Sequence, residues 1–203
     1  MLVDGVLLYN TPLLLVQGEY NSVRSIIINC LLSSQGMPRG LKQSSSVVAI
    51  GFSADEQAAN TFTESAVDLN LSPLDREVFV VLAINMDPFY PEAIAATDTR
   101  VSTSLTSTSQ ATAGRPTNLS NPNCLAAATN AIQQGTVPFQ TTLETPPANL
   151  DYIGIIATND FFVQVQGANN ANPTGVDGKL YGYRAVADAD IYAALVQSEA
   201  LSA

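Results

Sequence analysis

The segment Glu77-Val78-Phe79-Val80-Val81-Leu82-Ala83-Ile84 decides the fold class of this chain. β-Branched and aromatic residues dominate it, as is typical of a strand. Its apolar residues do not alternate with polar ones, so we expect both of its faces to be covered. The turn signal Ser72-Pro73-Leu74-Asp75 lies shortly before it. We therefore predict a buried strand over residues 77–84 within a β-rich fold.

Similar apolar runs lie towards the N-terminus. Residues 6–9, 13–17, 23–32 and 47–52 are rich in Val, Ile and Leu, and Asn, Gly, Pro or Ser clusters bound them. This length and these boundaries predict further strands. Residues 53–67 carry several acids and predict a short helix or an acidic loop.

The C-terminal part of the chain shows the clearest patterns. Residues 152–157 form an apolar run, and residues 161–166 and 180–186 alternate in polarity. These three segments predict an antiparallel meander. The run that follows predicts a C-terminal amphipathic helix over residues 188–201, because apolar residues recur at helical spacing: Ile191, Tyr192, Leu195 and Val196.

Residues 87–150 differ in composition and are interpreted as a Ser/Thr/Pro-rich excursion or arm within a single β-rich domain spanning residues 1–203. A Ser/Thr tract at residues 97–109 has the β-branched alternation of a half-covered strand, and the alternative is a low-complexity linker. Residues 125–134 are Ala-rich and end at Gly135, which predicts a short helix. The predicted fold class is mainly β (α+β): an antiparallel sandwich or barrel-like core with one or two short helices.

Composition narrows the possible functions. The chain has 203 residues, only 13% of them charged, and a net charge of −10. A phosphate-binding surface needs clustered bases, and none is visible here, so we expect neither nucleic acid nor a membrane as a direct partner. The apolar N-terminus has no basic segment before it and contains Asp4, Asn10 and Pro12, so we expect neither a signal peptide nor a span. A surface of hydroxyls and amides instead favours contact with other proteins.

Residues with catalytic chemistry are scarce. The chain has no histidine, which excludes histidine-based triads and most transition-metal sites. The remaining acid–base candidates are carboxylates, namely Asp87, Glu92 and Asp98, with Asp75 and Glu77 two residues apart. Oxygen donors that fit calcium occur at Asp151, Asn159, Asp160 and residues 169–177, although asparagines and aspartates in loops more often form turns with their own backbone. We expect no catalytic residue, no cofactor and no metal.

The two cysteines, Cys30 and Cys124, are interpreted as buried thiols, and the sequence leaves their pairing open. Candidate interface residues are Tyr181, Tyr183 and Arg184, since Tyr and Arg are enriched in interfaces, together with Val101 and Leu105 of the Ser/Thr tract. The alternative for the tyrosines is simple coverage of a sheet. Residues 1–16 and 97–114 are candidate arms that pair with a neighbour's sheet edge.

Three segments resemble virion structural proteins of tailed phages, especially marine and cyanobacterial ones. They are residues 71–88 (LSPLDREVFVVLAINMDP), 150–163 (LDYIGIIATNDFFV) and 183–195 (YRAVADADIYAAL). The resemblance implies a non-enzymatic protein made in the host cytoplasm and assembled into the virion. It carries no catalytic or ligand position to transfer.

The leading hypothesis is a capsid decoration or cement protein that bridges subunits of a phage head. Its expected partners are a major capsid protein and copies of itself, in a trimer or dimer. A tail or neck component (tube, adaptor or baseplate) is the alternative within the virion. A host-glycan-binding module using residues 159–178, and a carboxylate enzyme, are the alternatives from other classes.

Overall fold

The computed structural model describes residues 38–134, 139–144 and 151–201. The chain divides into two units, Met1–Met37 and Pro38–Ala203, and all of the described residues belong to the second unit. The strands predicted at residues 6–32, the candidate arm at residues 1–16, and Cys30 lie outside the described residues. The single domain over residues 1–203 therefore stays a prediction.

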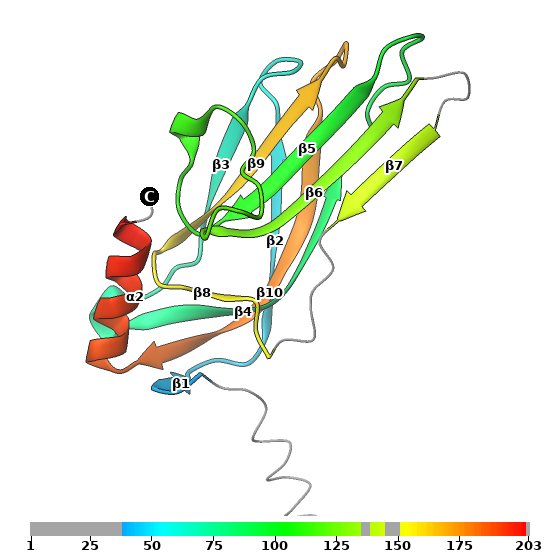
Figure 1. Cartoon of the computed structure of the whole chain (residues 1–203). Coiled ribbons are helices and arrows are strands. Elements are labelled where there is room, and N and C mark those ends of the chain that lie inside the picture. The colour runs from blue at the N-terminus through cyan, green and yellow to red at the C-terminus, as the bar shows by residue number, and fades with distance from the viewer. Residues whose placement is uncertain (1–37, 135–138, 145–150, 202–203) are drawn as a thin grey trace, which may run out of the picture. The chain divides into compact units, whose positions relative to one another are not determined.

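The second unit is mainly β, with two antiparallel five-stranded sheets, one of them a half-barrel, and a C-terminal helix (Figure 1). This confirms the predicted fold class. In sheet A, β10 (Gly175–Ala187) pairs with β1 (Leu41–Gln43) and β2 (Val48–Asp55) along one edge. Its other edge pairs with β4 (Glu77–Pro88), which in turn pairs with β8 (Gly154–Ile156).

Sheet B has the order β3-β9-β5-β6-β7. These strands are β3 (Thr63–Asp68), β9 (Asp160–Ala168), β5 (Thr99–Thr106), β6 (Cys124–Gln133) and β7 (Phe139–Glu144). Short 3₁₀ turns, η1 (Pro73–Asp75) and η2 (Ala111–Ala113), lie between strands. The turn signal predicted before the longest strand candidate is confirmed, since η1 ends at Asp75, Arg76 caps it, and β4 begins at Glu77.

The run in β4 is buried on both faces, as its lack of alternation predicted. Phe79 and Val81 belong to the core between the sheets, whereas Val78 and Val80 belong to a second cluster on the outer face of sheet A. The register between β10 and β4 shifts between Tyr181 and Gly182, and this leaves Leu82 without a cross-strand partner. Such a bulge exchanges the two faces of a strand. Beyond it, Ile84 and Met86 are the residues that reach the core.

A glycine of β10 makes this packing possible. A Cβ atom at Gly182 would lie 2.3 Å from the Val80 carbonyl oxygen and 2.4 Å from the Phe79 ring. The missing side chain lets the Phe79 ring cover the strand directly. The core between the sheets also contains an edge-to-face pair, Phe52 and Phe161, with ring centroids 5.8 Å apart.

Two predictions of secondary structure were wrong in the middle of the chain. Residues 125–133 of this predicted helix lie in strand β6, which is hydrogen-bonded between β5 and β7, so tertiary pairing overrides the preference of alanine for helix. Residues 53–67 hold the end of β2, a turn and most of β3, instead of a helix or acidic loop. The acid Glu56 is buried in that turn, where it accepts hydrogen bonds from the Gly167 and Thr174 amides.

The Ser/Thr tract is strand β5, at the centre of sheet B. The strand prediction is confirmed and the linker alternative is wrong. The use of residues 97–114 as a free arm is also wrong, because β9 and β6 already occupy both edges of β5. Within the predicted excursion at residues 87–150, β5, β6 and β7 are integral to sheet B.

The predicted meander at the C-terminus was wrong, although its strands exist. β8 pairs with β4 in sheet A, β9 lies in sheet B, and β10 returns to sheet A. Consecutive strands therefore cross between the sheets, which local alternation does not reveal. The helix prediction is confirmed by α2 (Ala189–Leu201).

Candidate functional site

Helix α2 lies against the outer face of sheet A. The Asp188 amide, just before the helix, donates to the Gly40 carbonyl at 3.0 Å, and the Tyr192 amide donates to Asp188 at 2.9 Å. These bonds start the helix beside the first described residues of the chain. Its apolar stripe then packs on the second cluster, as the sequence predicted: Ile191, Tyr192, Leu195 and Val196.

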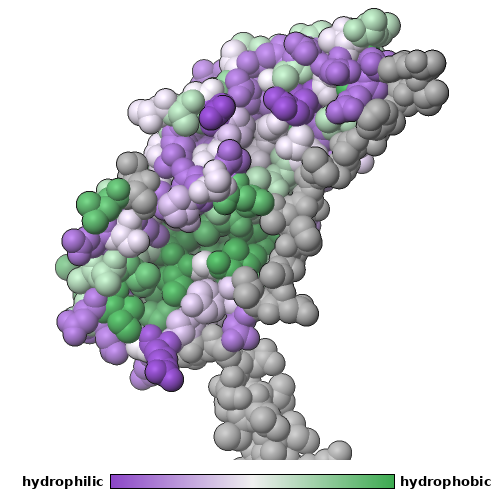
Figure 2. Space-filling view, viewed as in Figure 1, coloured by the Kyte–Doolittle hydropathy of each residue, from purple (hydrophilic) through white to green (hydrophobic). Residues whose placement is uncertain are grey.

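The packing of α2 leaves apolar residues partly uncovered. Figure 2 shows hydrophobic residues gathered over β4 and β8 beside the helix. Leu82, Tyr152 and Ile155, together with the four helix residues, are the partly buried members of this cluster. We call this set the α2–β8 surface. Contiguous exposed apolar area on a soluble protein usually marks a contact site.

Tyr183 lies at the base of the α2–β8 surface. It is 8% exposed and belongs to the second cluster. Burial, with a smaller contribution from the neighbouring Tyr152, raises the pKa of the Tyr183 phenol. Tyr183 therefore lies beneath the surface, whereas Tyr152 and Tyr192 remain partly exposed on it.

The other predicted interface residues have different positions. Val101 and Leu105 are 0% exposed and lie in the core between the sheets, so their assignment to an interface was wrong. Alternating strand residues point to opposite faces, and these two face inward. Arg184 is half-buried and donates to the Leu69 carbonyl at 2.9 Å. Tyr181 is also half-buried, one strand step from Leu180 of the core.

Sequence reasoning missed Glu199, in the last full turn of α2. Its carboxylate is 7% exposed and accepts hydrogen bonds from the amides of Ala157 at 3.1 Å and Thr158 at 2.9 Å. It thereby joins the end of the helix to the residues that follow β8. Burial raises the pKa of Glu199, and the two amides only partly oppose this effect.

The raised pKa of Glu199 predicts a pH dependence of stability. Above the ordinary glutamate pKa of about 4.3, the unfolded chain loses a proton that the folded chain still holds. Stability is therefore highest below this value and falls as pH rises through the folded pKa. In Glu199→Gln, we expect this decrease of the free energy of unfolding with rising pH to disappear. Urea unfolding across the same pH range measures it. Gln197→Ala, an exposed neighbour, should keep the wild-type slope.

Four of the five candidate catalytic carboxylates hold a loop or turn, and the fifth, Asp87, is an exposed residue of strand β4. Glu92 accepts hydrogen bonds from the Ala171 amide and the Asn172 side chain, and these bonds lower its pKa. Asp98 accepts from the Gln134 amide. Asp75 and Glu77 both bond Ser72, the residue before η1. Asp75, Glu77, Glu92 and Asp98 thus fix turns and loops through their hydrogen bonds.

Most candidate calcium ligands lie in loops or turns, while Asp160 begins β9 and residues 175–177 begin β10. Asn159 accepts from the Leu71 amide and donates to Asp68. Among the residues that the structure describes, no cluster of three or more His, Cys, Asp or Glu side chains is placed to hold a metal ion. Cys124 is a free thiol, and burial raises its pKa to about 11.

A polar network covers part of the outer face of sheet B. The fully buried Gln164 accepts hydrogen bonds from the Ser104 hydroxyl at 2.7 Å and from the Thr117 amide at 2.9 Å. Its side-chain nitrogen donates to Glu64 and Thr106. Thr117 belongs to the loop between β5 and β6, residues 107–123, so this network fixes the loop on the sheet.

The chain matches no protein-family profile, and no curated protein sequence matches it significantly. Across residues 38–134, 139–144 and 151–201, none of the helices combines the length and hydropathy needed to cross a bilayer.

Proposed function

We propose that this chain is a structural protein of a tailed-phage virion, a decoration protein that stabilises the head by bridging capsid subunits. The observation that carries the proposal is the α2–β8 surface, where apolar side chains remain partly uncovered beside a helix. The resemblance of residues 71–88, 150–163 and 183–195 to virion proteins supports the same conclusion. All three segments contribute to the surface, through Leu82 of β4, through Tyr152 and Ile155, and through α2.

The physical basis is mass action. A protein that binds the assembled shell more tightly than its free subunits shifts the equilibrium towards the shell. Apolar burial supplies roughly 25 cal/mol for each Å² removed from water, so covering the partly exposed residues of the α2–β8 surface would stabilise such a contact. The low charge content keeps the desolvation cost of broad contact small.

The surface predicts a specific effect of mutation on association. In Tyr152→Ser, we expect self-association of the full chain, measured by sedimentation velocity, to weaken by about tenfold or more, since aromatic residues dominate contact energies. Tyr90→Ser is the matched control, because Tyr90 is 71% exposed and lies outside the surface. Equal association constants for the two variants would contradict the assignment of the surface. A second variant, Leu82→Ser, guards against a local folding effect at Tyr152.

The location in the particle tests the wider proposal. Cryo-electron microscopy of virions that contain the chain should show it on the outer shell, with a copy number that follows the capsid lattice. A single ring on the tail axis would replace the head assignment by the tail or neck alternative. Particles that lack the chain should lose their shells at a lower temperature than complete particles.

A further inference from the structure

A second, polar surface lies on sheet B and is independent of the function proposed above. A hollow of about 260 Å³ opens on the outer face of this sheet. Its lining includes Arg100 and Ser102 of β5, Gln166 of β9 and Arg115 of the loop at residues 107–123. Arg100 and Ser102 lie opposite Ala168 and Gln166 across the strand pair. The side chains therefore come from neighbouring strands and from the loop above them.

The two arginines carry the argument. Both are exposed, and in the part of the chain that the structure describes neither guanidinium has a hydrogen bond or an ion pair. The chain has only eight basic residues against eighteen acids. Two unpaired cations in one hollow are therefore unusual for this composition, and together they favour an anion. Arginine binds planar carboxylates through paired hydrogen bonds.

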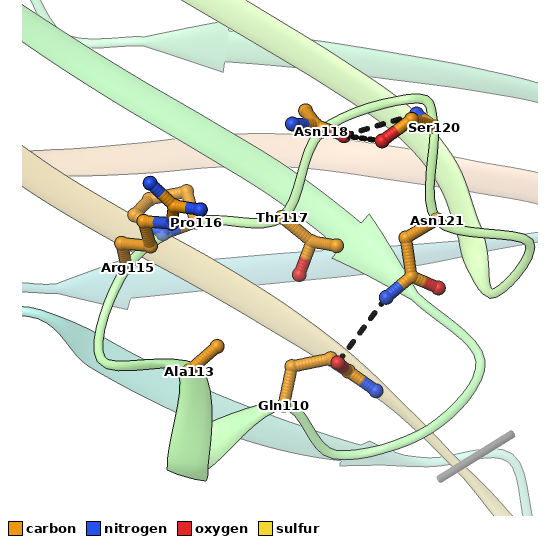
Figure 3. Close-up of a pocket in the computed structure, with 8 residues that line it drawn as sticks. All are labelled: Gln110, Ala113, Arg115, Pro116, Thr117, Asn118, Ser120 and Asn121. Atoms are coloured by element: carbon orange, nitrogen blue, oxygen red, sulfur yellow. Dashed lines mark hydrogen bonds between the residues drawn. The ribbon is translucent and has the colours of Figure 1, made fainter.

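The hollow is held in place before any ligand arrives. Arg115 and Pro116 lie side by side in the loop, two residues or fewer from Thr117 (Figure 3). The Thr117 amide and hydroxyl bond the buried Gln164 at 2.9 and 2.8 Å. Asn121 and Gln110 close the loop with a further hydrogen bond. A fixed loop lowers the entropy cost of placing Arg115 on a ligand.

We propose that this hollow binds a carboxylated sugar, a uronic acid residue being the simplest case. The carboxylate would accept hydrogen bonds from Arg100 and Arg115. Ser102 and Gln166 would bond the ring hydroxyls, and neither side chain has another hydrogen bond within the described residues. A lining of hydroxyl and amide groups beside the arginines suits a polyhydroxylated ring better than an acidic peptide, which offers mainly its carboxylate.

The surroundings agree with an open site. A second hollow of about 270 Å³ continues beyond Arg100, towards Thr99, Gln133 and Asn169. Its one acid, Asp98, already accepts a hydrogen bond from the Gln134 amide at 2.7 Å. The face of sheet B therefore offers room for a second ring of a saccharide chain.

The test is an NMR titration of the full chain with glucuronate, glucose, acetate and a short poly-glutamate peptide. We expect saturable chemical-shift changes of the Ser102 and Gln166 amides when glucuronate is added. Glucose and acetate should each bind with an affinity lower by about tenfold or more. Arg100→Gln and Arg115→Gln should each weaken glucuronate binding by about tenfold or more. Arg76→Gln makes the same change of charge at an exposed position outside the hollow and should bind as the wild type does.

Several outcomes would overturn the proposal. Acetate binding as tightly as glucuronate would show that the ring makes no contact, and equal binding of glucose would show that the carboxylate makes none. Tighter binding of the peptide would assign the hollow to an acidic protein segment. Absence of any saturable shift with glucuronate would remove the site. None of these results affects the α2–β8 surface, whose test is self-association.

Discussion

Phe161→Ala is expected to lower the free energy of unfolding by about 3–5 kcal/mol. Phe161 is fully buried in the core between the sheets, and its ring meets Phe52 edge-to-face at 80°. The substitution removes the ring, leaves a cavity that the two sheets are unable to close, and loses an aromatic pair worth roughly 1 kcal/mol beyond its buried area. Urea unfolding followed by circular dichroism measures the effect.

The adjacent residue is the matched control. Phe162 belongs to the same strand but points to the other face of sheet B and is half-buried, so Phe162→Ala should cost less than half as much. A double-mutant cycle with Phe52→Ala isolates the ring pair, because residues in contact are not additive. Strict additivity of the two substitutions would show that the rings do not stabilise each other.

Gln164→Leu is expected to destabilise the fold by about 2–4 kcal/mol, despite the similar size of the two side chains. The leucine would leave the Thr117 amide, the Ser104 hydroxyl and Glu64 with fewer partners in a buried site. Buried polar groups that lose a partner keep their full desolvation cost. Urea unfolding measures the change, and hydrogen exchange should show faster opening at the Thr117 amide.

Gln166→Leu is the matched control for this network. Gln166 lies on the same face of β9, is partly exposed and has no hydrogen bond within the described residues, so its replacement should change stability by less than about 0.5 kcal/mol. A similar cost for both variants would indicate that leucine on this face is unfavourable in itself. The Gln164 variant should also weaken glucuronate binding, because Arg115 would lose its fixed loop.

The candidate site could be anticipated only in part. The stripe at residues 191–196 predicted which side of α2 would pack, and continuing its spacing to residue 199 would have placed Glu199 on the same side. Tyr183 was identified as a candidate, but its burial in the second cluster depends on β4, β8 and α2, which come from distant parts of the chain. The hollow on sheet B left no local signal, since Arg100 and Arg115 are separated by a strand end and a loop.

The sequence by itself determined the mainly β class, the double burial of β4, the strand in the Ser/Thr tract and the C-terminal helix. Each of these follows from local periodicity, local residue preference or the absence of alternation, which one segment carries alone. Only the tertiary structure decided which sheet each strand joins. It also decided that residues 124–133 form a strand and that the two faces of β4 are exchanged at Leu82. Strand pairing satisfies backbone groups with partners far along the chain, so its outcome depends on the whole set of strands at once.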